Sequence, residues 1–192
     1  MNADPMSLSG PAGHTPPPEV EVWDAAALAS EQSLTLFQKL LLCTDGTVTE
    51  LLALYCGKPI QAKKLSQFMR VGPLAGLGCV DGARVLERSV LLGSADGGVY
   101  LHARSYFVFD RFSTAIQRDL IDTEQPIGLM WRAERLEMYR EITDRRRQCN
   151  PAIAALLGVA PELPLLSRTY RIIHGGFDLG IITETFAGTV LA

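Results

Sequence analysis

An arginine in an apolar strand pattern is the first residue in this sequence that could do chemistry. In the run from Leu86 to Val90, Arg88 alternates with both of these aliphatic residues, so all three side chains are expected on one face of a strand. A guanidinium turned toward a core is costly unless an anion meets it. Two interpretations stay open: a structural ion pair, or a clamp for the carboxylate of a ligand, which the planar fork of arginine matches bidentately.

Glu184 presents the same situation near the end of the chain. It lies between Ile182 and Phe186 in an alternating pattern, so its carboxylate is expected to point inward with them. An inward acid either pairs with an inward arginine or serves a ligand. Arg88 and Glu184 could therefore satisfy one another, and the alternation alone does not separate this ion pair from a ligand site.

Two further places could bind an anion. Arg104 lies between His102 and Tyr106 on a more polar strand face, where an isolated arginine is typical of the protein surface. In Pro126-Ile127-Gly128, the proline is suited to the first helical position, and the backbone N–H groups after it are free to meet an anion.

The sequence lacks the motifs of several other kinds of catalytic site. The three histidines are too scattered for a zinc site, and there is no Gly-x-Ser-x-Gly motif. The glycine-rich stretch 72–82 lacks the spacing of a dinucleotide loop and is expected to be a mobile flap. The four cysteines form no CxxC pair and are expected to be buried, reduced thiols. No metal and no organic cofactor is expected.

Composition sets the class of protein. The net charge of −3 argues against a nucleic-acid partner held by bulk electrostatics. No Lys or Arg precedes Lys39, which does not fit a secretory or organellar leader, and no run of eighteen apolar residues could span a membrane. We therefore expect a cytoplasmic protein. Residues 1–22 hold five prolines and are expected to form a disordered tail before one domain, 23–192.

The elements that position these residues follow from hydrophobic periodicity. Thr47 and Glu50 fit a capping box at a helix start, and the basic run 145–147 is expected at a helix end. Helical patterns cover 22–55, 113–121 and 126–147, and two hairpins are expected, 84–92 with 99–109 and 166–173 with 179–186. This order predicts an α+β fold: a single antiparallel sheet of about six strands with flanking helices.

Six short motifs, taken in order, resemble one family. They are Leu41-Leu-Cys-Thr-Asp-Gly-Thr-Val-Thr49, Leu86-Glu-Arg-Ser-Val-Leu-Leu92, Leu101-His-Ala-Arg-Ser105, Gln125-Pro-Ile-Gly128, Ser167-Arg-Thr-Tyr-Arg171 and Ile182-Thr-Glu-Thr-Phe186. Their order and spacing are similar to those of the chorismate pyruvate-lyases over roughly residues 34–187. The sequence departs from the family in its Pro-rich extension and at Phe177-Asp178 in the last hairpin.

The resemblance implies a role for each matching residue. Arg88 corresponds to the arginine that holds the ring carboxylate, and Ile127 to the residue whose backbone N–H meets the same group. Glu184 corresponds to the acid near the ring hydroxyl. Arg104 corresponds to a second arginine near the enolpyruvyl end, and Val48 to a residue that lines the pocket.

The resemblance also implies an activity and an alternative. The activity is a cofactor-independent carbon–oxygen lyase reaction that converts chorismate into 4-hydroxybenzoate and pyruvate, in a monomer or a homodimer. The alternative is a non-catalytic small-molecule sensor domain of the same fold, as in some transcription regulators. Those sensors follow a DNA-binding module, whereas a tail without Lys or Arg is not expected to grip phosphates.

Overall fold

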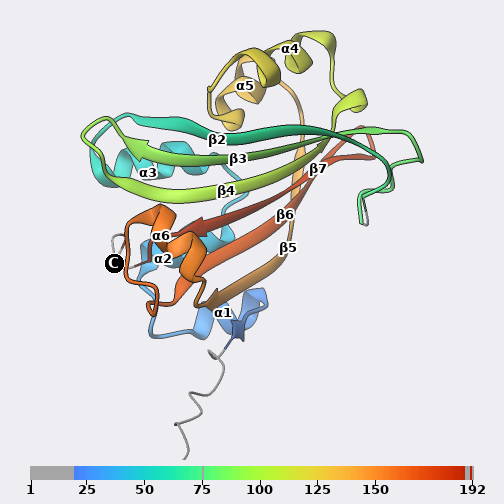
Figure 1. Cartoon of the computed structure of the whole chain (residues 1–192). Coiled ribbons are helices and arrows are strands. Elements are labelled where there is room, and N and C mark those ends of the chain that lie inside the picture. Colours follow the sequence, from blue (N-terminus) through green and yellow to red (C-terminus); the bar gives the residue numbers. More distant parts are fainter. Residues whose placement is uncertain (1–19, 75, 189–190, 192) are drawn as a thin grey trace, which may run out of the picture.

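Seven antiparallel strands form one sheet in the computed structural model, which describes residues 20–74, 76–188 and 191 (Figure 1). The strand order is β1-β5-β6-β7-β4-β3-β2. The strands are β1 (Glu21–Val22), β2 (Ile60–Val71), β3 (Arg84–Ser94), β4 (Val99–Val108), β5 (Tyr139–Gln148), β6 (Leu165–His174) and β7 (Phe177–Phe186). The predicted α+β class with a single antiparallel sheet is confirmed, and the short β1 makes a seventh strand.

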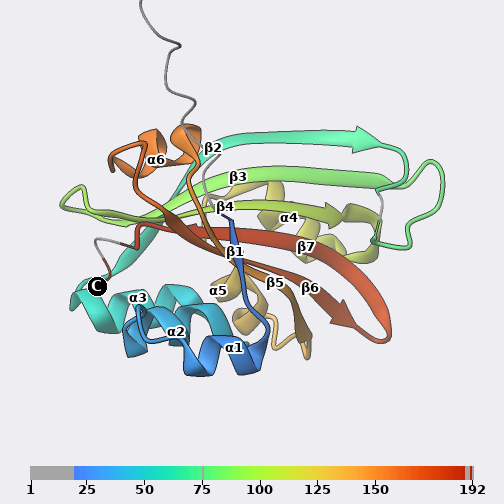
Figure 2. The same cartoon turned by 90° about the horizontal axis from the view of Figure 1, so that it is seen from below.

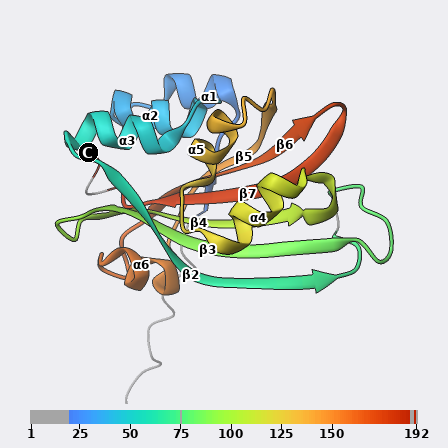
Figure 3. The ribbon, with the colours of Figure 1, turned by 90° about the horizontal axis from the view of Figure 1, so that it is seen from above.

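Helices cover one face of the sheet far more fully than the other. In Figures 2 and 3, α1, α2, α3 and α5 lie on one side of the sheet and α6 lies on the other. The helices are α1 (Ala25–Ser30), α2 (Leu36–Cys43), α3 (Val48–Cys56), α4 (Thr114–Asp122), α5 (Ile127–Ala133) and α6 (Pro151–Leu157), with a 3-10 turn at Phe109–Arg111. Within the described ranges, no helix is long and apolar enough to cross a membrane.

Both predicted hairpins are present. The β3–β4 turn has Gly97 at φ +95°, and the β6–β7 turn has Gly175 and Gly176 at φ +56° and +82°. These backbone angles cost glycine little, which explains why the turns fall at the glycines. The hairpins fix the register of the four central strands, and with it the face on which each side chain lies.

The helix predicted over 126–147 is wrong in its second half. Only Ile127–Ala133 is helical, and Tyr139–Gln148 is strand β5, paired along its length with β6. The whole stretch 126–147 is rich in Arg and Glu, which favour helix in isolation. Pairing with β6 overrides that preference because it satisfies the backbone groups and places ion pairs such as Arg171–Glu141 across the two strands.

Other local predictions are also corrected. Thr47 is the N-cap of α3, but its side chain makes no capping hydrogen bond, and the capping box lies instead at Thr35 and Gln38 of α2. The helical stretch 22–55 contains three helices, and the third begins at Val48, directly after Thr47, as expected. Most of the predicted 1–22 tail lies outside the described residues, although its last two residues form β1 and pair with β5.

The core consists mainly of two apolar clusters on the helix-covered face. One joins α1, α2 and α3 to the sheet through residues such as Leu52, Leu101 and Phe186. The second joins α4 and α5 to it through residues such as Phe107 and Trp131. The cysteines are free, but Cys43 is exposed and the other three are only partly buried, so the expectation of buried thiols is wrong.

Gly180 of β7 lies where this strand closely approaches β4. A Cβ at this position would lie 2.5 Å from both Phe107 Cδ1 and the Tyr106 carbonyl oxygen. Because this interior is close-packed, we expect Gly180→Ala to lower the free energy of unfolding by about 1–3 kcal/mol, measured by urea denaturation. Gly188→Ala is the matched control, since its methyl group would meet Leu166 at an ordinary 3.5 Å. Equal stability of the two variants would contradict the tight contact.

Candidate active site

A pocket lies on the helix-covered face of the sheet, between the two apolar clusters. Its floor comes from β2, β3, β4, β5, β6 and β7, and its roof from the starts of α3 and α5. About 610 Å³ inside it is free of protein atoms, part of which is open to solvent. Its lining residues are Gly46, Thr47, Val48, Thr49, Ala62, Arg88, Val90, Leu92, Ala103, Ser105, Pro126, Ile127, Gly128, Trp131, Arg140, Tyr170, Ile182 and Glu184.

The alternation rule places Arg88 correctly. Its side chain points into the pocket from the middle of β3 and is only 3% exposed. One terminal nitrogen donates to the Gln125 carbonyl oxygen at 3.3 Å, while the buried Nε has no partner. Among the described residues no carboxylate lies within ion-pair distance of Arg88. Burial lowers the pKa of this guanidinium and the charge of Glu124, beyond ion-pair distance, raises it, but arginine stays protonated in proteins.

Glu184 also points into the pocket, from β7, but its partner is Arg168 of β6. Arg168 Nε donates to Glu184 Oε2 at 2.7 Å, and the Tyr170 hydroxyl donates to Oε1 at 3.1 Å. Arg168 is only 1% exposed, and it also donates to the Thr44 carbonyl oxygen. Burial and the Glu184 charge raise the pKa of Tyr170, while the charges of Arg168 and Arg140 oppose that rise. Tyr170 is therefore a phenol that donates to Glu184.

This arrangement excludes the ion pair between Arg88 and Glu184 that the sequence left open. Glu184 does not pair with Arg88, because Arg168, one strand away from it in the sheet, takes that place. Arg88 is left as a buried cation without an acidic partner among the described residues, beside a cavity. A buried guanidinium in this state favours a bound anion. The alternation rule applied to Arg168, which lies between Leu166 and Tyr170, could have revealed the ion pair.

The roof of the pocket brings the starts of α3 and α5 together. Val48, Ile127 and Gly128 all line it, as predicted. A Cβ on Gly128 would lie 2.9 Å from Thr47 Cγ2, so the absence of a side chain allows this close approach. Arg132 of α5 also forms an ion pair with Glu50 of α3, which links the two helices.

The stretch 72–82, which was expected to be a flap, packs away from the pocket. No described residue of the stretch 72–82 lines the pocket. Instead Leu77 is fully buried in a small apolar cluster, and Arg111 donates to the carbonyl oxygens of Leu77 and Gly78. The starts of α3 and α5 take the covering role that the sequence assigned to this loop.

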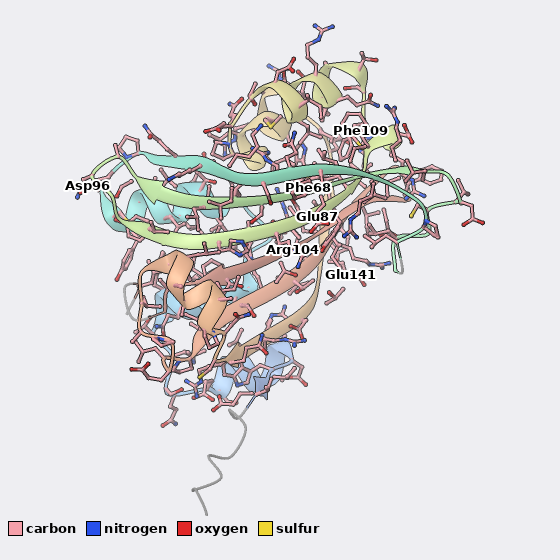
Figure 4. The ribbon with its side chains drawn as sticks, in the orientation of Figure 1. Phe68, Glu87, Asp96, Arg104, Phe109 and Glu141 are labelled. Carbon is pink, nitrogen blue, oxygen red and sulfur yellow. The ribbon has the colours of Figure 1, made fainter. Side chains whose placement is uncertain are left out.

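Arg104 is the predicted site residue that the structure does not bring to the pocket. Figure 4 shows Arg104 and Glu87 on the face of the sheet that carries α6, opposite the pocket. Arg104 Nε donates to Glu87 Oε1 at 3.1 Å, and its guanidinium lies 5.2 Å from the centre of the Tyr106 ring. The reason is parity, because Arg104 is one residue from Ser105, whose side chain faces the pocket.

Arg140 is a pocket residue that the sequence did not indicate. It lies on β5, where a helix was predicted, so its direction could not be inferred. Its guanidinium donates to the Asp45 carbonyl oxygen and lies 5.8 Å from the Trp131 ring centre. The Trp131 Nε1 is buried without a partner. Arg140 is thus a second cation in the lining.

The charges of the lining suit an anionic ligand. Arg88 and Arg140 have no carboxylate partner among the described residues, whereas Glu184 is neutralised by Arg168. The remaining surface is mostly aliphatic and aromatic, which suits a small ring compound. In the described part of the chain, no three His, Cys, Asp or Glu side chains gather where they could hold a metal ion.

Comparison with solved structures finds the same fold in other bacterial proteins. PhnF from Mycobacterium smegmatis matches with a TM-score of 0.61 at 20% identity, over 78% of this chain and 67% of that one. The ligand-binding domain of a putative GntR-family transcriptional regulator from Bordetella bronchiseptica matches with a TM-score of 0.51 at 16% identity, over 66% and 84%. At these identities the likeness concerns the fold alone.

The sequence comparisons define the family. The family model described as chorismate pyruvate-lyase Rv2949c-like matches residues 42–191, and the chain belongs to this family. A chorismate pyruvate-lyase of Mycobacterium leprae is 33% identical over 157 residues, which cover 79% of this chain and 74% of the relative. One of Mycobacterium tuberculosis is 27% identical over 165 residues, covering 79% and 80%. The family resemblance inferred from the six motifs is confirmed.

The Arg168–Glu184 pair yields a prediction about stability. Arg168→Met leaves the Glu184 carboxylate buried without its counterion, so we expect the free energy of unfolding at neutral pH to fall by about 3–5 kcal/mol in chemical denaturation. Adding Glu184→Gln to this variant removes the unpaired charge and should recover part of the loss. If the double variant is less stable than Arg168→Met alone, the pair is not the origin of the effect.

Proposed function

We propose that this protein is a chorismate pyruvate-lyase, which eliminates pyruvate from chorismate to give 4-hydroxybenzoate. The observation that carries the proposal is the buried Arg88 guanidinium, which faces a mostly apolar pocket without an acidic partner among the described residues. Chorismate is a ring compound with a carboxylate that such an arginine can bind bidentately. Membership of the family and the relatives named chorismate pyruvate-lyase support this assignment.

The reaction requires little covalent chemistry from the protein. The bond between ring carbon C3 and the ether oxygen breaks, and C4 loses its proton. The enolpyruvyl methylene can accept that proton in a cyclic transition state, so the fragment leaves as pyruvate while the ring becomes aromatic. Every atom of chorismate then appears in the two products. Catalysis in this scheme comes from holding the substrate in the reactive conformer and from fixed charges around it.

The pocket residues fit these tasks. Arg88, with the backbone N–H of Ile127 beside it, would hold the ring carboxylate. Glu184 would accept a hydrogen bond from the C4 hydroxyl. Its Oε2 accepts one bond from Arg168 Nε and its Oε1 one from the Tyr170 hydroxyl, and each oxygen can accept a second. Val48 and Gly128 would shape the wall over the ring.

The alternative is a domain that binds a small molecule without converting it. The likeness to the PhnF effector domain, with a TM-score of 0.60 at 19% identity, favours it at the level of fold. A fold hosts unrelated functions, so this likeness does not choose between binding and turnover. An assay of the purified full chain chooses between them.

We expect the protein to convert chorismate into equal amounts of 4-hydroxybenzoate and pyruvate without added metal or cofactor. The ring product is followed by its absorbance, and pyruvate by coupling to lactate dehydrogenase. Spontaneous decay of chorismate is measured in parallel without protein. Tight binding of 4-hydroxybenzoate with no turnover at micromolar protein would reject the lyase and support the binding domain.

Arg88→Gln tests the site. We expect kcat/KM for chorismate to fall about 100-fold or more, because removing one partner of a buried charge pair costs roughly 2–5 kcal/mol. The variant should also bind 4-hydroxybenzoate more weakly, as measured by calorimetry. Arg146→Gln is the control, since Arg146 pairs with Asp144 on the other face of the sheet. Full activity of Arg88→Gln would reject this assignment even if the lyase activity is present.

A further inference from the structure

Arg140 is a cation of the pocket that the roles given above leave unused. It reaches the cavity from β5, whereas Arg88 reaches it from β3, and three strands separate the two in the sheet. At about 4.8 Å per strand spacing, the two strands are roughly 19 Å apart along a flat sheet. The two guanidinium groups therefore reach the cavity from opposite sides of its floor.

The Arg140 side chain is held in place by uncharged groups. Its terminal nitrogen donates to the Asp45 carbonyl oxygen just before α3, and its guanidinium lies over the Trp131 ring of α5. Within the described ranges it has no carboxylate within 4.0 Å. Its charge is therefore oriented but not neutralised, which suits the binding of an anion.

The covalent structure of chorismate indicates where its second carboxylate would lie in the pocket. In chorismate the C4 hydroxyl is opposite the ring carboxylate, and the enolpyruvyl ether is on the carbon next to that hydroxyl. With the ring carboxylate at Arg88 and the hydroxyl at Glu184, the enolpyruvyl group must lie on the Glu184 side of the ring. Arg140 and Tyr170 come from β5 and β6, beyond Glu184 of β7 as seen from Arg88.

We propose that Arg140 binds the enolpyruvyl carboxylate of the substrate and so takes the role that the sequence assigned to Arg104. This inference rests on the proposed function. Arg88 and Arg140 together match the two carboxylates of a dianion, while the Glu184 charge is compensated by Arg168. Arg104 cannot contribute, because it lies on the opposite face of the sheet, paired with Glu87.

The test uses the difference between substrate and product. 4-Hydroxybenzoate retains the ring carboxylate and the hydroxyl but has lost the enolpyruvyl carboxylate. We expect Arg140→Gln to lower kcat/KM for chorismate about 10- to 100-fold, the effect of losing hydrogen bonds to a charged group. Its Kd for 4-hydroxybenzoate should stay within about threefold of the wild type. Arg88→Gln should lower kcat/KM for chorismate and also weaken the binding of 4-hydroxybenzoate.

Matched variants separate this role from a structural one. Arg140→Lys keeps the charge but loses the planar fork, so kcat/KM should lie between those of Arg140→Gln and the wild type. Arg146→Gln, on the same strand but facing away from the pocket, should match the wild type for both ligands. If Arg140 only supports the fold through Asp45 and Trp131, Arg140→Gln will weaken the binding of chorismate and of 4-hydroxybenzoate equally and will lower Tm. That result would overturn the proposal.

Failure of this inference can be told from failure of the proposed function. If the wild type converts chorismate and Arg140→Gln does so with unchanged kcat/KM, only the role of Arg140 is rejected. If the wild type binds chorismate without turnover, equilibrium Kd values for chorismate and 4-hydroxybenzoate give the same comparison. If the wild type binds neither compound, both the function and the role of Arg140 are rejected.

Discussion

The buried ion pair between Arg168 and Glu184 decides the chemistry of this pocket. Both side chains point inward from neighbouring strands, where an unpaired charge would be strongly unfavourable. Arg168 gives the buried Glu184 carboxylate a counterion, while Glu184 also lines the cavity. The same pairing leaves Arg88 without a protein carboxylate among the described residues, so an anionic ligand can complete the site.

The position of the pocket follows from how the core is divided. Two apolar clusters pack on the same face of the sheet, and the inward polar residues lie in the gap between them. The clusters anchor α3 and α5, whose starts meet above the gap at Gly128 and Thr47. Close packing on both sides therefore holds the charged groups in fixed positions, which is the condition for electrostatic preorganisation.

The same fold in regulators and in a lyase family illustrates that a fold does not define an activity. The structural matches compared above are at 20% identity or less and concern the fold alone. An activity depends on the side chains that face the cavity. The opposite face carries Arg104 and Arg146, which are paired with Glu87 and Asp144 and do not line the pocket.

Strand alternation and glycine turns are local properties, so the α+β class, both hairpins and the inward direction of Arg88 and Glu184 could be predicted from the sequence. The sequence also carried the six motifs that identified the family. The partner of Glu184 and the strand that carries Arg140 depend on the tertiary structure. Those outcomes depend on which strands become neighbours. Pairing between distant segments overrides local helix preference, as β5 shows, and it brings residues as far apart in the sequence as Arg88 and Glu184 into one site.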